Sequence, residues 1–170
     1  MKRQQSGFTL IELIIVIVIL GILAITAAPR FFNFGTDARA STLNGLKGAL
    51  ESASSLVYGK AVIAGLQNAN ACLTNAGAVI ADSGSGCGTG GFSLVNGYPA
   101  ADSATMIYIL ELAVTGSPAV PVDWTIDETA TNSLFFQPSG YTPSTGECRL
   151  TYTEAGTGTK PTLVVSAGGC

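Results

Sequence analysis

The sequence contains no histidine, and only 11% of its 170 residues are charged. The missing histidine removes the side chain that proteins use most for acid–base catalysis near neutral pH and for binding transition metals. Positive charge is also scarce, with eight Lys and Arg residues and no basic cluster beyond Lys2 and Arg3. Binding to a nucleic-acid backbone needs many such side chains, so we expect no nucleic-acid partner.

Motifs of common catalytic and cofactor sites are missing as well. No G-x-S-x-G segment is present, and without histidine no evident base activates a serine. Gly86, Gly88 and Gly91 match G-x-G-x-x-G, but they follow no clear strand and open no helix, as a dinucleotide site requires. The four cysteines lack C-x-x-C spacing. The sequence therefore predicts no enzyme, no cofactor and no metal site.

One long apolar run lies near the N-terminus. From Phe8 to Ala28 the chain has 21 residues whose single formal charge is Glu12. As an α-helix this run is about 31 Å long, enough to cross the hydrocarbon core of a bilayer. Lys2 and Arg3 precede it, which indicates a cytoplasmic N-terminus. We expect one membrane span; a secretory signal peptide fits poorly, because no small-x-small cleavage site ends a short apolar core.

Glu12 is unusual for a plain membrane anchor. A carboxylate at the centre of a membrane helix costs about 2.5–3.5 kcal/mol, and less near the membrane edge. The nearest basic residues, Lys2 and Arg3, lie nine or ten positions earlier, so we expect no partner within the chain. Ionisable residues inside membrane segments are usually functional. The sequence therefore predicts that another molecule supplies the partner of Glu12.

Gly21 and Pro29 are the two helix-breaking residues near the end of this run. Proline lacks the N–H for its i−4 hydrogen bond and clashes with that carbonyl, here the carbonyl of Ile25, at a cost of about 3 kcal/mol. Glycine costs about 1 kcal/mol relative to alanine. We expect the helix to be kinked here.

Gly7 followed by "FTLIE" and a long Ile/Leu/Val run resembles the class III signal of type IV prepilins and pseudopilins. The resemblance implies that a prepilin peptidase cleaves between Gly7 and Phe8 and that Phe8 becomes the N-methylated first residue. It also implies that Glu12 pairs with the terminal amine of a neighbouring subunit, which is largely cationic at neutral pH. The segment between Gly21 and Pro29 would unwind when subunits pack into a filament.

The same resemblance implies an α+β pilin fold, in which one long N-terminal helix packs on a C-terminal antiparallel sheet of about four strands. Residues 1–7 would be a cleaved leader, 8–34 the membrane anchor and filament core, and 35–170 the globular head. The residues themselves predict that the helix continues into the head, where Thr36 or Asp37 would cap it after the break. An apolar seam with 3-4 spacing supports this second half and comprises Leu43, Leu46, Leu50, Ala53 and Val57.

The rest of the head divides into a loop, a short helix and strands. Residues from about 66 to 100 are rich in Gly, Asn and Ser and predict a loop. The run "AADSATMIYILEL" from Ala100 predicts a short helix capped by Asp102 or Ser103. Four segments between about 122 and 170 predict strands: "DWTI", "SLFFQP", "ECRLTYT" and "KPTLVVSA". The last two flank a glycine-containing turn and predict a hairpin.

Four cysteines on the outer side of the membrane predict disulfides, for which three pairings are possible. The expected hairpin would bring Cys148 and Cys170 to opposite positions at its open end. Type IV pilins close their C-terminal loop with such a pair. The resemblance therefore implies Cys148–Cys170, and with it Cys72–Cys87 across the glycine-rich loop.

About the first 62 residues most resemble the mannose-sensitive haemagglutinin (MSHA) branch of type IV pilins. That likeness implies a major pilin of a filament for surface attachment and biofilm formation. Its partners would be copies of itself, the prepilin peptidase, and an inner-membrane assembly platform with its ATPase. The chain would sit in the inner membrane as a single-pass precursor and then in an extracellular pilus.

The alternative is a pseudopilin of a type II secretion system, or a minor or tip pilin that acts as a binding module. Secretion pseudopilins often have a calcium site where pilins have the terminal disulfide. Asp123, Asp127 and Glu128 are candidate ligands for such a site, although a solvated acidic edge is the better interpretation. The cysteine pair favours the pilin.

Overall fold

The structure is a computed structural model that describes residues 7–82, 87–88, 91–110, 123–128, 130–142 and 147–170, and only the backbone of 27–33. The chain divides into two units, Met1–Ala38 and Arg39–Cys170. The element order is α1, β1 to β4, α2, then β5 to β8.

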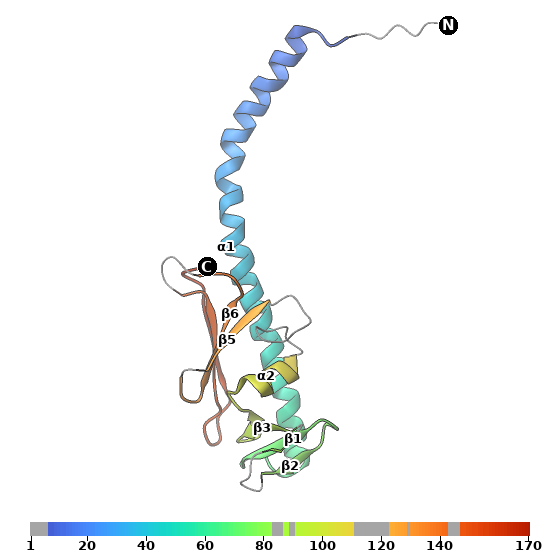
Figure 1. Cartoon of the computed structure of the whole chain (residues 1–170), viewed down its shortest axis with the longest axis vertical. Coiled ribbons are helices and arrows are strands. Elements are labelled where there is room, and N and C mark those ends of the chain that lie inside the picture. Colours follow the sequence, from blue (N-terminus) through green and yellow to red (C-terminus); the bar gives the residue numbers. More distant parts are fainter. Residues whose placement is uncertain (1–6, 83–86, 89–90, 111–122, 129, 143–146) are drawn as a thin grey trace, which may run out of the picture. The chain divides into compact units, whose positions relative to one another are not determined.

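The first helix, α1, runs without interruption over 54 residues from Leu10 to Ile63 and is the long coiled ribbon of Figure 1. In the first unit its large apolar side chains are exposed, from 46% for Ile14 to 78% for Ile25, and Phe8 just before the helix is 91% exposed. In the described part of the chain, no helix combines the length and the apolar character that crossing a membrane demands. The first unit thus buries none of its large apolar side chains described between Phe8 and Ile25.

The expected cap at Thr36 or Asp37 after a break in this helix is wrong for the chain by itself. α1 keeps helical backbone through Gly21 and Pro29, so Thr36 and Asp37 do not cap a new helix. One turn before Pro29, the hydroxyl of Thr26 donates to the carbonyl of Leu23 at 3.0 Å. Unwinding between Gly21 and Pro29 concerns the packed filament and stays a prediction.

The second unit contains the predicted four-stranded antiparallel sheet. Its strands are β5 (Trp124–Asp127), β6 (Ser133–Pro138), β7 (Arg149–Thr153) and β8 (Thr162–Ser166), in the order β5-β6-β7-β8. The predicted hairpin is β7–β8, with Tyr152 opposite Leu163. Burial alternates along β6 and β7, so that one face of the sheet is apolar and inward.

This inward face packs with the second half of α1 in the main core. The seam is confirmed: Leu43, Leu46, Leu50 and Val57 are buried, and Ala53 is half-buried. The main core cluster contains residues of α1, α2, β6 and β7 together with one disulfide: Leu43, Leu46, Leu50, Met106, Leu134, Phe136, Cys148, Leu150, Tyr152 and Cys170. The α+β fold with a long N-terminal helix on an antiparallel sheet is therefore confirmed.

A second sheet occupies the region for which the sequence predicted only a loop. It consists of β1 (Ala71–Thr74), β2 (Val79–Ala81), β3 (Gly91–Val95) and β4 (Tyr98–Pro99), in the order β2-β1-β3-β4. Asn96 and Gly97 connect β3 to β4 with φ of 51° and 78°, the left-handed pair typical of a two-residue hairpin turn. The Asn-Gly pair was a sequence signal for this hairpin that the composition of the region obscured.

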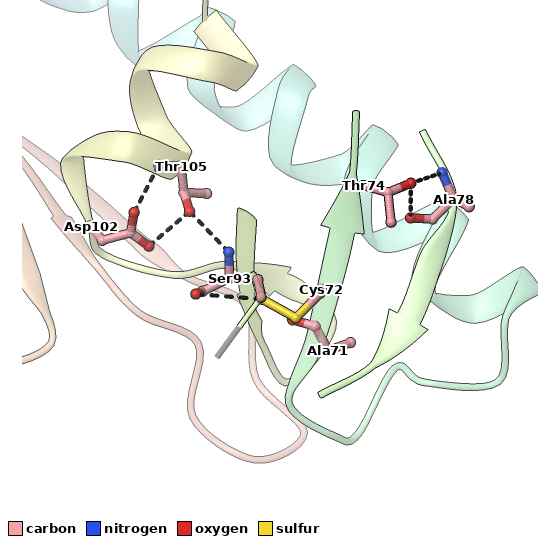
Figure 2. Close-up of a disulfide and its surroundings, with 8 residues drawn as sticks. Ala71, Cys72, Thr74, Ala78, Ser93, Asp102 and Thr105 are labelled. Atoms are coloured by element: carbon pink, nitrogen blue, oxygen red, sulfur yellow. Dashed lines mark hydrogen bonds between the residues drawn. A yellow bond between two sulfur atoms is a disulfide. The ribbon is translucent and has the colours of Figure 1, made fainter. Parts of the chain in front are cut away.

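The second helix, α2 (Ser103–Leu110), confirms the predicted short helix. Asp102 is its N-cap: one carboxylate oxygen accepts from the Thr105 N–H and the other from the Thr105 hydroxyl, each at 2.7 Å (Figure 2). The Thr105 hydroxyl oxygen also accepts from the N–H of Ser93 in β3, at 3.2 Å. This cap therefore joins α2 to the small sheet; residues 111 and 112 of the predicted run lie outside the described residues.

Candidate processing and assembly site

The site predicted from the sequence begins with Gly7 and Phe8, which precede α1 in a segment without regular secondary structure. Both residues are exposed. A Cβ built on Gly7 would meet no atom within 4 Å. Among the described residues no contact therefore requires a glycine at this position, and its part in processing stays a prediction.

Glu12 lies in the first turn of α1, where Thr9 contacts it three times. The N–H and the hydroxyl of Thr9 both donate to Oε2 of Glu12 at 2.8 Å, and the Glu12 N–H donates to the Thr9 hydroxyl at 3.4 Å. This reciprocal pattern is a capping box, which satisfies backbone donors that a helix start otherwise leaves unpaired. A negative side chain here is also favoured by the helix dipole.

The expectation that Glu12 has no partner in the chain is therefore wrong. Thr9 supplies neutral hydrogen-bond donors to the carboxylate and not a cation. The signal was present, because "TLIE" has the T-x-x-E spacing of a capping box in front of an apolar run. The pairing of Glu12 with an amine from another subunit stays a prediction.

The four cysteines form the two disulfides that the resemblance implied, Cys72–Cys87 and Cys148–Cys170. Cys72 lies in β1, and Cys87 lies close enough to Ser93 of β3 for a polar contact of 3.7 Å (Figure 2). The first disulfide thus braces the small sheet. Cys148 directly precedes β7, so the second disulfide ties residue 170 to an inner strand of the larger sheet.

Residue 170 is also held by two side chains, Arg39 and Tyr141, that no sequence pattern indicated. The guanidinium of Arg39 donates to the Cys170 carbonyl at 3.0 Å and lies 4.1 Å from the centre of the Tyr141 ring. The Tyr141 hydroxyl lies 2.6 Å from the carbonyl of Gly169 and 2.8 Å from that of Cys170. The Arg39 contact joins residues 131 positions apart in sequence, a relation that no local pattern reveals.

The structure also bears on the candidate metal ligands. In the part of the chain that the structure describes, no group of three or more His, Cys, Asp or Glu side chains is placed to hold a metal ion. Glu128, one of the candidate calcium ligands, instead accepts a hydrogen bond from the N–H of Ser103 at the start of α2. A cavity of about 460 Å³ lies beside α1 and α2 and is lined mainly by apolar side chains such as Leu56 and Ile109.

Comparison with family models places one motif on this chain. Residues 2–28 match the model described as the prokaryotic N-terminal methylation motif. This match covers the predicted cleavage position between Gly7 and Phe8, Glu12, and the apolar half of α1. The chain thus carries the N-terminal signal of type IV pilin precursors.

Among curated proteins, similarity is confined to the N-terminal part. The chain is 43% identical over 53 residues to the type IV major fimbrial protein FimA of Dichelobacter nodosus, a match that covers 31% of this chain and 34% of FimA. It is 46% identical over 50 residues to the type IV narrow pilus major component PilA5 of Thermus thermophilus, a match that covers 29% of this chain and 43% of PilA5. It is 48% identical over 44 residues to the type II secretion system core protein G of Pseudomonas aeruginosa, a match that covers 26% of this chain and 31% of core protein G.

The chain therefore spans between 31% and 43% of the length of the curated relatives it matches. Over that length it is homologous to type IV pilins. No solved structure matches the chain. The residues that follow α1 are therefore described from their own structure, without comparison to a relative.

Proposed function

We propose that this chain is the precursor of a structural subunit of a type IV pilus. The observation that carries the proposal is the first unit: an apolar helix with exposed side chains, a carboxylate in its first turn, and the methylation motif across both. Exposed apolar area costs about 25 cal/mol per Å² in water, so this helix needs another apolar environment. A bilayer supplies it before assembly, and the helices of other copies supply it in a filament.

Processing at Gly7 and Phe8 connects the two states. A prepilin peptidase would cleave between them and methylate Phe8, which leaves a terminal amine four residues before Glu12. In the filament, Glu12 of one copy would accept that amine from the next copy and fix the axial register. An inner-membrane assembly platform and its ATPase would move the subunit from the membrane into the filament. The chain itself has a structural role and carries out no catalytic step.

A pseudopilin of a type II secretion system is the second candidate, favoured by the similarity to core protein G of such a system. The Cys148–Cys170 disulfide favours the pilus subunit, because it closes the C-terminal loop covalently. Assignment to the MSHA branch, with a role in attachment and biofilm formation, rests on the resemblance of about the first 62 residues and stays a prediction. A minor or tip subunit would share the same N-terminal chemistry.

The test is the intact mass of the chain in the fraction sheared from the surface of producing cells. We expect a mass for Phe8–Cys170 with one added methyl group and four hydrogens fewer, because both disulfides are formed. The same mass in the membrane fraction alone would favour the pseudopilin. A chain that still begins at Met1 would refute the proposed processing.

Two variants separate processing from assembly. Glu12→Val should be inserted and cleaved normally but give few or no surface filaments. Gly7 replaced by a bulky residue should leave uncut precursor in the membrane. Abundant filaments from Glu12→Val would refute the role of the carboxylate.

A further inference from the structure

The two strong contacts between Thr9 and Glu12 end on one carboxylate oxygen. The Thr9 N–H and hydroxyl both donate to Oε2 at 2.8 Å. Across the residues that the structure describes, no hydrogen bond ends on Oε1 of Glu12. A carboxylate has lone pairs on both oxygens. The side chain is therefore held through Oε2 while Oε1 keeps its capacity to accept.

We propose that Thr9 is a positioning residue, which holds the Glu12 carboxylate so that Oε1 accepts the terminal amine of a second copy of this chain. The inference rests on the proposed function, in which that amine belongs to Phe8 of the next subunit. Thr9 touches neither the amine nor the cleaved bond in this role. It acts through Glu12.

Preorganisation is the physical reason for the role. A glutamate side chain loses rotamer freedom when it is fixed, and this loss opposes any contact that needs one orientation. The Thr9 hydrogen bonds fix Glu12 before the second copy arrives. Pairing with the amine then requires little further loss of side-chain entropy. Hydrogen bonds to an ionised carboxylate are also stronger than neutral ones, particularly where water is excluded.

The distances separate this role from ordinary helix capping. A capping hydroxyl acts as an acceptor for a backbone N–H in the first turn. Here that contact, from the Glu12 N–H to the Thr9 hydroxyl, is long at 3.4 Å, whereas the contact that the hydroxyl donates is 2.8 Å. The hydroxyl of Thr9 therefore acts chiefly as a donor to the carboxylate. Since its bond ends on Oε2, it does not compete with an amine for Oε1.

The experiment measures the pairing directly in cells that produce and process the full chain. Membrane and filament fractions are treated with a carbodiimide, which joins a carboxylate to an amine in contact with it. The peptide that links Glu12 to Phe8 of another copy is then quantified by mass spectrometry. Its amount is divided by the amount of processed chain from the intact mass of the same sample. Wild type is compared with Thr9→Val, Thr9→Ser and, as the blank, Glu12→Gln.

Thr9→Val keeps the shape of the side chain and loses the hydroxyl, so we expect about a five- to tenfold lower linked fraction. Thr9→Ser keeps the hydroxyl and should restore the wild-type fraction. An unchanged or larger fraction in Thr9→Val would overturn the inference, since the hydroxyl would then be idle or a competitor. A serine variant as poor as the valine variant would overturn it too.

Failure of the proposed function has a different signature. Processed wild-type chain that gives no link between Glu12 and Phe8 would refute the pairing itself, and the role of Thr9 with it. A normal wild-type link with no effect of Thr9→Val refutes only the role of Thr9.

Discussion

Removing the Cys148–Cys170 disulfide should destabilise the head more than removing Cys72–Cys87, by a margin that loop length alone does not give. The cysteines are 22 and 15 positions apart, for which the chain-entropy model gives about 3.4 and about 3.0 kcal/mol. The Cys148–Cys170 disulfide, however, also holds the segment whose carbonyls bind Arg39 and Tyr141. Each such bond contributes about 1 kcal/mol net, so we expect a loss of about 4–6 kcal/mol against about 3.

The assay is urea unfolding of the full chain in mild detergent, followed by the fluorescence of Trp124. It is the single tryptophan and packs against the main core. Paired Cys→Ala variants avoid burying a serine hydroxyl at Cys148, which is 1% exposed. Tyr141→Phe should lower the free energy of unfolding in wild type and have almost no effect once Cys148 and Cys170 are replaced. Equal losses from the two disulfide variants, or an additive Tyr141→Phe, would refute this reasoning.

Three further variants test the fold through the same unfolding assay. Asp102→Ala should lower the free energy of unfolding by about 1 kcal/mol through loss of the α2 cap, and Asp102→Asn should restore most of it; equal losses would contradict the cap. Gly97→Ala should lower the free energy of unfolding more than Gly158→Ala does. Both glycines have positive φ, but only at Gly97 would a Cβ meet backbone, 2.9 Å from the Cα of Gln67. Similar losses for the two variants would show that this contact relaxes freely. The buried Tyr152 phenol donates to the Pro99 carbonyl, and burial raises its pKa above the usual value near 10, so stability should be steady at neutral pH and fall above about pH 10 as the unfolded chain ionises first. Tyr152→Phe should reduce this alkaline loss, and an unchanged pH profile would count against its origin in Tyr152.

The sequence predicted the elements that a local pattern specifies. The 3-4 seam from Leu43 to Val57 predicted the buried face of α1, and alternation with turn residues predicted the four strands of the larger sheet. Asp102 was one of two candidates for the cap of α2 and is the residue that performs it. These features depend on residues within a few positions of each other, so they can be read without a tertiary structure.

What the sequence did not predict depends on short strands or on distant contacts. The small sheet has strands of two to five residues, too short for an alternating pattern, and glycine and asparagine dominated the composition around them. The contact of Arg39 with residue 170 appears only when the chain has folded. The hydrogen bonds between Thr9 and Glu12 are local, and the T-x-x-E spacing is sufficient to predict them.

The contacts of residue 170 also define a mechanical route through the head. A pull along α1 enters the second unit at Arg39, the first residue of that unit. From there the guanidinium passes load to the Cys170 carbonyl, and the disulfide passes it covalently to Cys148, next to β7. Since β7 is an inner strand, hydrogen-bonded to β6 on one side and β8 on the other, load that reaches it is shared with both neighbouring strands. The Arg39 hydrogen bond and the Cys148–Cys170 disulfide therefore connect the sheet to α1 in addition to the apolar seam, so a pulling force is not borne by side-chain packing alone.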